Sequence, residues 1–126
     1  MLGLFSADDN KLTGPLPREV FAMIDLRYFS IENNQISGKI PDLLVSWKDL
    51  EFLNARKNRL TGSISAYIGD LHKLQVVDLS DNLITGRIPA TISGLKDLRT
   101  LRVENNHMAG MFVVDLEHTS KEERRC

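Results

Sequence analysis

The sequence has few of the residues that mark disulfide-bonded or nucleic-acid-binding proteins. Its only cysteine is Cys126, the last of 126 residues, so no disulfide can form within the chain. Such a chain fits a reducing compartment, or a fragment of a larger secreted protein whose cysteines lie elsewhere. The 16 Lys and Arg against 17 Asp and Glu leave a net charge of -1. No overall field therefore favours nucleic acid or an anionic membrane.

Hydrophobic runs and catalytic groupings are equally scarce. No apolar run is long enough to span a bilayer, and Met1 precedes neither a basic leader nor a small-residue cleavage site. His72, His107 and His118 share no metal-ligand spacing with each other or with cysteine. No Ser-His-Asp set and no phosphate-binding glycine loop can be assembled. We therefore expect no membrane insertion, no metal, no cofactor and no enzymatic activity.

The chain instead contains a strict repeat. Asparagine recurs every 24 residues, at Asn10, Asn34, Asn58, Asn82 and Asn106. Glycine follows four residues after each of them, at Gly14, Gly38, Gly62, Gly86 and Gly110. Such a period is the signature of a solenoid, in which each unit packs only against its neighbours. We expect five repeats over residues 1–116, with units starting near residues 2, 26, 50, 74 and 98, and a charged tail or cap at residues 117–126.

Apolar positions within each unit predict one strand and one outer turn. Residues eight, five and three positions before each asparagine are apolar: Leu2, Phe5 and Ala7, then Leu26, Phe29 and Ile31, then Leu50, Leu53 and Ala55, then Leu74, Val77 and Leu79, then Leu98, Leu101 and Val103. The final spacing of two predicts a short strand with one face inward.

Further apolar columns complete each unit. One lies between asparagine and glycine, at Leu12, Ile36, Leu60, Ile84 and Met108, and one after the glycine, at Leu16, Ile40, Ile64, Ile88 and Phe112. Apolar residues farther on predict a helical or 3₁₀ turn on the convex side, at Val20, Leu44, Ile68, Ile92 and Leu116, with Met23, Trp47, Leu71 and Leu95 three residues later. The predicted fold is a right-handed α/β solenoid with a parallel inner sheet.

The asparagine column has a structural explanation. A tight coil leaves backbone N–H and C=O groups pointing into the stack, away from water. An Asn amide both donates and accepts, so a ladder of asparagines can satisfy those groups between successive coils. We expect the loss of one to cost about 1–3 kcal/mol. These residues are interpreted as scaffold.

Two segments, LRYFSIENNQISGKIPDLLVSWKDL and LQVVDLSDNLITGRIPATISGLKDL, carry the pattern LxxLxLxxNxLTGxIPxxLxxL. The chain thus resembles the plant-type leucine-rich repeat over nearly its whole length. The resemblance implies recognition of a protein or peptide on the concave face, as in ectodomains of receptor-like kinases and receptor-like proteins in signalling or defence. It places the chain on the extracellular side of a membrane-anchored receptor, with any kinase activity in a domain absent from this chain.

Two other functions stay open. One is a free-standing intracellular scaffold, which would be cytoplasmic, and the other is a soluble inhibitor similar to those of polygalacturonases. Ser65 replaces the family's proline in the third unit, and Ala109 and Val113 break the Thr and Pro columns in the fifth. The first unit has an uncapped apolar end, so we expect a fragment, with further repeats or a capping domain at its N-terminal side.

Strand alternation predicts three outward columns on the concave sheet, which we call the grid. The first column is Leu4, Tyr28, Phe52, Val76 and Thr100; the second is Ser6, Ser30, Asn54, Asp78 and Arg102; the third is Asp8, Glu32, Arg56, Ser80 and Glu104. Neighbouring aromatics on a rigid sheet are typical anchors of a protein contact. They could instead be strand formers, or be covered by a loop.

The predicted ligand-binding residues all lie in the grid: Tyr28, Phe52, Val76, Asn54, Arg56, Asp78, Arg102 and Glu32. Opposite charges are expected side by side in three pairs, Glu32 with Arg56, Asp78 with Arg102, and Lys57 with Asp81. This self-compensation argues further against a nucleic-acid partner.

Overall fold

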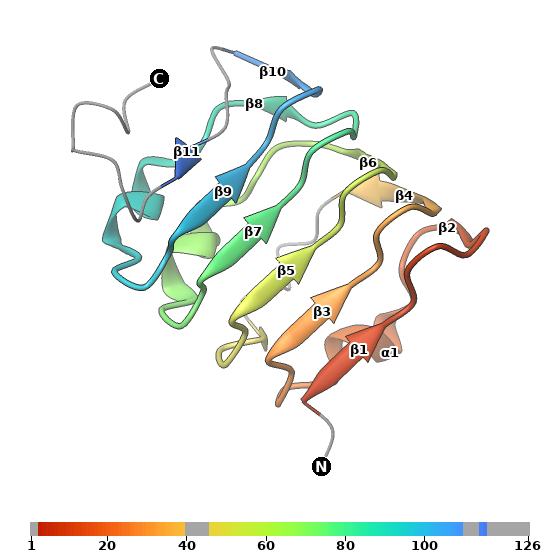
Figure 1. The fold of residues 1–126 in the computed structure, drawn as a ribbon, viewed down its shortest axis with the longest axis horizontal. Coiled ribbons are helices and arrows are strands. Elements are labelled where there is room, and N and C mark those ends of the chain that lie inside the picture. Colours follow the sequence, from red (N-terminus) through yellow and green to blue (C-terminus); the bar gives the residue numbers. More distant parts are fainter. Residues whose placement is uncertain (1–2, 40–45, 110–113, 116–126) are drawn as a thin grey trace.

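The computed structural model describes residues 3–39, 46–109 and 114–115. Its main sheet has 6 strands in the order β1-β3-β5-β7-β9-β11. These strands are β1 (Leu4–Ser6), β3 (Tyr28–Ser30), β5 (Phe52–Asn54), β7 (Val76–Asp78), β9 (Thr100–Arg102) and β11 (Val114–Asp115). Figure 1 shows them as one row, with the helical turns behind. The expected α/β leucine-rich-repeat solenoid is confirmed.

Several expected positions lie outside the described residues. They are Leu2, Ile40, Leu44, Gly110, Phe112, Val113, Leu116 and the tail at 117–126.

Parallel pairing in the main sheet follows the sequence period. Tyr28 pairs with Leu4 on one side and with Phe52 on the other, and Phe52 pairs in turn with Val76. Equivalent residues of successive coils are therefore direct neighbours, so each grid column is also a spatial row.

A second row of strands begins where the main strands end, which sequence reasoning missed. It consists of β2 (Thr13–Gly14), β4 (Gln35–Lys39), β6 (Arg59–Thr61), β8 (Thr85–Gly86) and β10 (His107–Met108). They form sheets β2-β4-β6 and β10-β8, joined by the bridge Ser63↔Thr85, and Figure 1 shows them beyond the main strands. Their register is staggered, because Thr13 pairs with Gln35 and Ser37 with Arg59.

The glycine column has a physical reason in this second row. Gly62 and Gly86 have φ angles of 81° and 84°, in the left-handed region that favours glycine. A Cβ at Gly86 would also lie 3.0 Å from Ser63 Cβ, and one at Gly62 would lie 3.3 Å from Lys39 Cγ. The position therefore needs glycine for its backbone and for close packing of the preceding coil.

Short helical turns carry the chain back to the next strand. They are α1 (Arg18–Phe21), η2 (Ala66–Asp70) and η3 (Ala90–Gly94). Pro17 and Pro89 precede two of them at the cap position. At the third, Ser65 accepts a hydrogen bond from Tyr67 N at 3.1 Å, so the serine that departs from the family pattern caps its turn. In the described part of the chain, no helix is long and apolar enough to cross a membrane.

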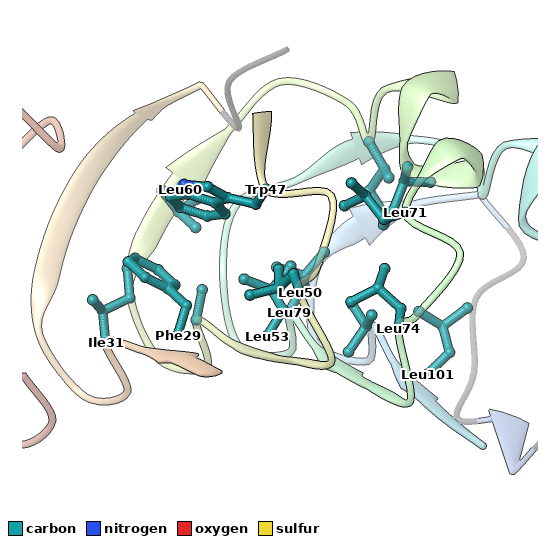
Figure 2. Packing of buried hydrophobic residues seen from close by; sticks show 14 of the residues in the cluster. Phe29, Ile31, Trp47, Leu50, Leu53, Leu60, Leu71, Leu74, Leu79 and Leu101 are labelled. Atoms are coloured by element: carbon teal, nitrogen blue, oxygen red, sulfur yellow. The ribbon is translucent and has the colours of Figure 1, made fainter. Parts of the chain in front are cut away.

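The core lies between the main sheet and these turns. It contains the expected inward columns and, in Figure 2, Phe29 and Trp47 lie against each other, with ring centroids 4.8 Å apart. The prediction that Leu12 and Met23 face the core is wrong, because Leu12 is 44% and Met23 40% exposed. Both belong to the first coil, which packs against another coil on one side only.

The ladder asparagines join successive coils as their chemistry demands. Asn58 donates from Nδ2 to the carbonyl oxygen of Ile31 at 2.9 Å and to that of Ala55 at 3.1 Å. Its Oδ1 accepts from Ile36 N at 3.0 Å. Asn34, Asn82 and Asn106 make equivalent bonds. Asn10 is exposed and donates only within its own coil, to the carbonyl oxygens of Ala7 and Asp8.

The residue before each ladder asparagine has a left-handed backbone. These residues are Asp9, Asn33, Lys57, Asp81 and Asn105, with φ between 57° and 61°. Asp and Asn tolerate this conformation better than other side-chain-bearing residues, which accounts for four of the five.

The last main-sheet strand differs from the prediction. The sequence pattern continues through residue 116, and it predicts that the stretch after the fifth glycine lies on the convex side. Instead β11 returns to the sheet and pairs antiparallel with β9, with Val114 opposite Leu101. An added strand satisfies backbone groups that β9 would otherwise expose at the edge of the sheet.

Candidate functional site

The first grid column forms an accessible aromatic and aliphatic stripe. Tyr28 and Phe52 stack with ring centroids 4.4 Å apart and ring planes inclined by 5°. Val76 follows Phe52 on the next strand, and both aromatic residues are half-buried. Because Phe29 and Leu53 next to them point into the core, the backbone holds the two rings on the open face. The stripe thus combines rigid placement with exposure.

Polar residues beside the stripe are less exposed than the sequence predicted. The grid was expected to face outward throughout, but Ser30 is 0%, Asn54 9% and Ser80 2% exposed. Ser30 Oγ donates to Asp8 Oδ1 at 2.6 Å, and Asn54 Nδ2 donates to Glu32 Oε1 at 2.7 Å. Ser30 and Asn54 each bond a longer acidic side chain of the preceding coil. The outward residues of the grid are therefore linked by hydrogen bonds and are not separate groups.

The predicted charge pairs are present in part. Arg56 lies 3.8 Å from Glu32, as expected, but its Nε also lies 3.4 Å from Asp81 Oδ2. The expected pair of Lys57 with Asp81 is wrong, because among the described residues the cation beside Asp81 is Arg56. Arg56 is therefore held between two carboxylates.

The expected pair of Asp78 with Arg102 is also wrong, although the two residues are direct neighbours in register. Asp78 Oδ1 accepts from Ser80 Oγ at 2.5 Å, and Arg102 lies 3.7 Å from Glu104. Each side chain instead has its partner two residues farther along the chain.

The structure therefore divides the predicted site residues into three sets. Tyr28, Phe52 and Val76 form the stripe, and Glu32, Asn54 and Arg56 form one bonded cluster. Asp78 and Arg102 each make a local pair instead, Asp78 with Ser80 and Arg102 with Glu104, although Asp78 pairs in register with Asn54. Sequence reasoning undervalued Asp8 and Asp81, each of which bonds two residues of the neighbouring coils. The 24-residue period places Asp81 beside Lys57, which follows Arg56 in the sequence. The contact of Asp81 with Arg56 could therefore have been predicted from the period.

Outside the grid, one pair of ionisable residues forms a close contact. In the described ranges, no group of three or more His, Cys, Asp or Glu side chains could hold a metal ion. Asp49 accepts a hydrogen bond from Lys73 Nζ at 2.8 Å, and this bond and the ammonium charge lower the pKa of Asp49 below its ordinary value. That pair is exposed on the approach to the strands and stands apart from the grid.

Comparison with known families identifies the class of protein. Family models described as leucine rich repeat match residues 63–108 and 25–47. No curated protein sequence matches significantly. Together with the stacked coils and the ladder, these matches show that the chain belongs to the leucine-rich-repeat proteins.

Solved structures narrow the resemblance to plant receptors. The chain is 31% identical, with a TM-score of 0.80, to the ectodomain of the receptor kinase GASSHO1/SCHENGEN3 from Arabidopsis thaliana, over 83% of this chain and 13% of that one. It is 34% identical, with a TM-score of 0.82, to the plant peptide hormone receptor RGFR1, over 85% of this chain and 17% of that one. A chain of the BIR3–SERK2 complex from Arabidopsis thaliana matches at 30% identity and a TM-score of 0.79, over 92% and 62%. This chain thus spans a small part of the large receptors.

Proposed function

We propose that this chain is a recognition module that binds an extended peptide or protein segment on the concave face of its main sheet. The observation that carries the proposal is the stack of Tyr28 on Phe52, half-buried and open to solvent on a face of paired strands. Aromatic residues in such settings supply most of the energy of protein contacts, because they bury a large area.

The site is organised before any ligand arrives. The two rings already stack, and Glu32 Oε1 and Asn54 Oδ1 already accept hydrogen bonds at 2.7 and 3.0 Å. Few rotors then have to be ordered on binding, so less of the contact energy is spent on entropy. Val76 extends the apolar surface along the stack.

Charge suggests the character of the ligand. The grid holds four acidic residues, Asp8, Glu32, Asp78 and Glu104, against two basic ones, Arg56 and Arg102, a balance of -2. Complementarity then favours a ligand with an apolar side chain for the stripe and a positive charge nearby.

The similar structures support the receptor interpretation. The GASSHO1/SCHENGEN3 ectodomain was solved in complex with CASPARIAN STRIP INTEGRITY FACTOR 2, and the peptide hormone receptor RGFR1 in complex with RGF2. We propose the same class of role here, as part of a receptor-like ectodomain on the extracellular side of a membrane, with signalling output from elsewhere in the receptor.

Panning a displayed peptide library on the chain would supply ligands for the test. A Y28S/F52S double variant should lose about tenfold or more in affinity for the selected peptides, because the anchor is gone. Calorimetry measures the affinity, and circular dichroism should report an intact fold. Tyr67→Ser is the matched control, because Tyr67 is 55% exposed on η2, on the opposite side of the core. Equal losses in both variants would place the ligand elsewhere.

A further inference from the structure

The second row of strands presents a face with only one sign of charge. We call the outward side of residues 11–15, 35–39, 59–63, 83–87 and 107–109 the lateral face. It contains Lys11, Lys39, Arg59 and Arg87, together with His107, and no Asp or Glu. The lateral face thus carries +4 in a chain whose net charge is -1, whereas the neighbouring grid carries -2.

These cations are available to a partner. Lys11, Lys39, Arg59 and Arg87 are all exposed, and none of them takes part in an ion pair among the described residues. The Arg and Lys of the other surfaces that do form ion pairs are Arg56, Lys73 and Arg102. Uncompensated like charge on one exposed face attracts anions, and binding an anion would relieve the repulsion among the cations.

The charges alternate between two lines along the stack. Lys11 and Arg59 begin their segments, with His107 in the same place, whereas Lys39 and Arg87 end theirs. Strand β4 runs from one line to the other, and four extended residues separate them by about 13 Å. Between the lines lie hydroxyl side chains, Thr13, Ser37, Thr61 and Thr85.

We propose that the lateral face binds a linear acidic polysaccharide, a polyuronate, that lies along the hydroxyl row. The row's hydroxyls match the polymer's hydroxyls, and its carboxylates meet Lys or Arg alternately from each side. The aliphatic part of Lys39 packs on Gly62, with Lys39 Cγ 3.3 Å from the position that a Cβ of residue 62 would take. This contact supports the side chain that carries the ammonium group.

Other polyanions fit this face less well. Single-stranded nucleic acid is held by stacking of its bases on aromatic rings, and these segments contain no Phe, Tyr or Trp. A protein partner needs buried apolar anchors, and the large exposed hydrophobic residues described in these segments, Leu12 and Leu83, lie in the first and fourth segments, with two segments between them. A ligand that is both polyhydroxylated and regularly charged uses everything that the face offers.

The test is binding of the full chain to a fluorescently labelled polygalacturonate oligomer, followed by anisotropy at increasing salt. Binding should weaken steeply with salt, and the K39Q/R59Q/R87Q variant should lose about tenfold or more in affinity at low salt. The control variant K48Q/K96Q/R99Q removes the same number of exposed charges from the approach to the strands and should change affinity less than about twofold. The fully methyl-esterified polymer, which has the same backbone without charge, should not bind.

Several outcomes would overturn the proposal. They are no binding at low salt, equal losses in the two triple variants, or equal binding of the esterified polymer. Tighter binding of oligothymidylate or of poly-glutamate would show that the face recognises another polyanion. Because the Y28S/F52S variant leaves the lateral face intact, it should bind the oligomer normally, so the outcome is independent of the peptide proposal.

Discussion

Four of the ladder asparagines, Asn34, Asn58, Asn82 and Asn106, each hold two coils together through the hydrogen bonds of one amide. Asn58 is buried, and it satisfies Ile31 O in the preceding coil as well as Ile36 N, which no other group described here satisfies. A buried backbone group that loses its partner keeps the full cost of desolvation. Stability at this position therefore depends on the amide, whereas the proposed binding depends on the grid.

Replacing Asn58 by Ala should lower the free energy of unfolding by about 1–3 kcal/mol, because it leaves the buried Ile36 N without its partner and removes one of the two hydrogen bonds to Ile31 O, which keeps that from Asn34. Urea denaturation measures the change. Asn10→Ala is the matched control, since Asn10 is exposed and bonds only its own coil, and it should cost less than about 1 kcal/mol. If the two variants lose equal stability, the bonds between coils contribute nothing beyond local turn structure.

The contacts of a residue could be predicted where the 24-residue period determines them, but not where they depend on the side-chain rotamer. The period placed Tyr28 beside Phe52 correctly, because register follows from the 24-residue spacing alone. It could not place Arg102 on Glu104 instead of Asp78, because that choice rests on side-chain torsions. It also missed the burial of Ser30, since a short side chain is covered by whatever bonds it.

At the scale of elements, the outer turns η2 and η3 contact each other more closely than their weakly patterned sequences indicate. A Cβ at Gly69 in η2 would lie 2.6 Å from Thr91 Cβ and 2.8 Å from Thr91 O in η3. Thr91 Oγ1 donates to Ala66 O at 2.7 Å, so the two turns are also bonded. Glycine at residue 69 therefore sets the distance between successive coils on this side.

Replacing Gly69 by Ala should destabilise the fold by about 1–3 kcal/mol, because the added methyl group must push the backbone of η3 away. Thermal unfolding measures the change. Gly94→Ala places the same methyl group in open space in η3, and it should be neutral or stabilising by up to about 1 kcal/mol. Equal effects in the two variants would mean that the turns do not pack as described.

The main strands and outer turns were predictable because apolar spacing records them directly. The second row of strands was not predictable. Its segments are built around Thr-Gly or Ser-Gly pairs, and each contributes only one apolar column to the core. Return of β11 to the sheet edge was also missed, because edge pairing is made by backbone groups that carry no sequence signal.

At the scale of the molecule, one repeat builds two surfaces of opposite charge. The grid offers an aromatic stripe among mostly acidic residues, and the lateral face offers cations among hydroxyls. Both use positions that the fold leaves free once the ladder, the glycines and the apolar columns are fixed. The fold class followed from those fixed positions, whereas the partners depend on the free ones, which is why sequence pattern indicated the architecture more fully than the site.

The most direct test of the main account is a map of where a selected peptide binds on the ¹⁵N-labelled chain. Chemical-shift changes on titration should concentrate in residues 28–32, 52–56 and 76–80, which carry the stripe and the cluster around Arg56, and should leave η2, η3, β4 and β6 unchanged. Shifts that instead concentrate on the outer turns or the second row of strands, with β3 and β5 unperturbed, would contradict the assignment of the concave face as the recognition surface.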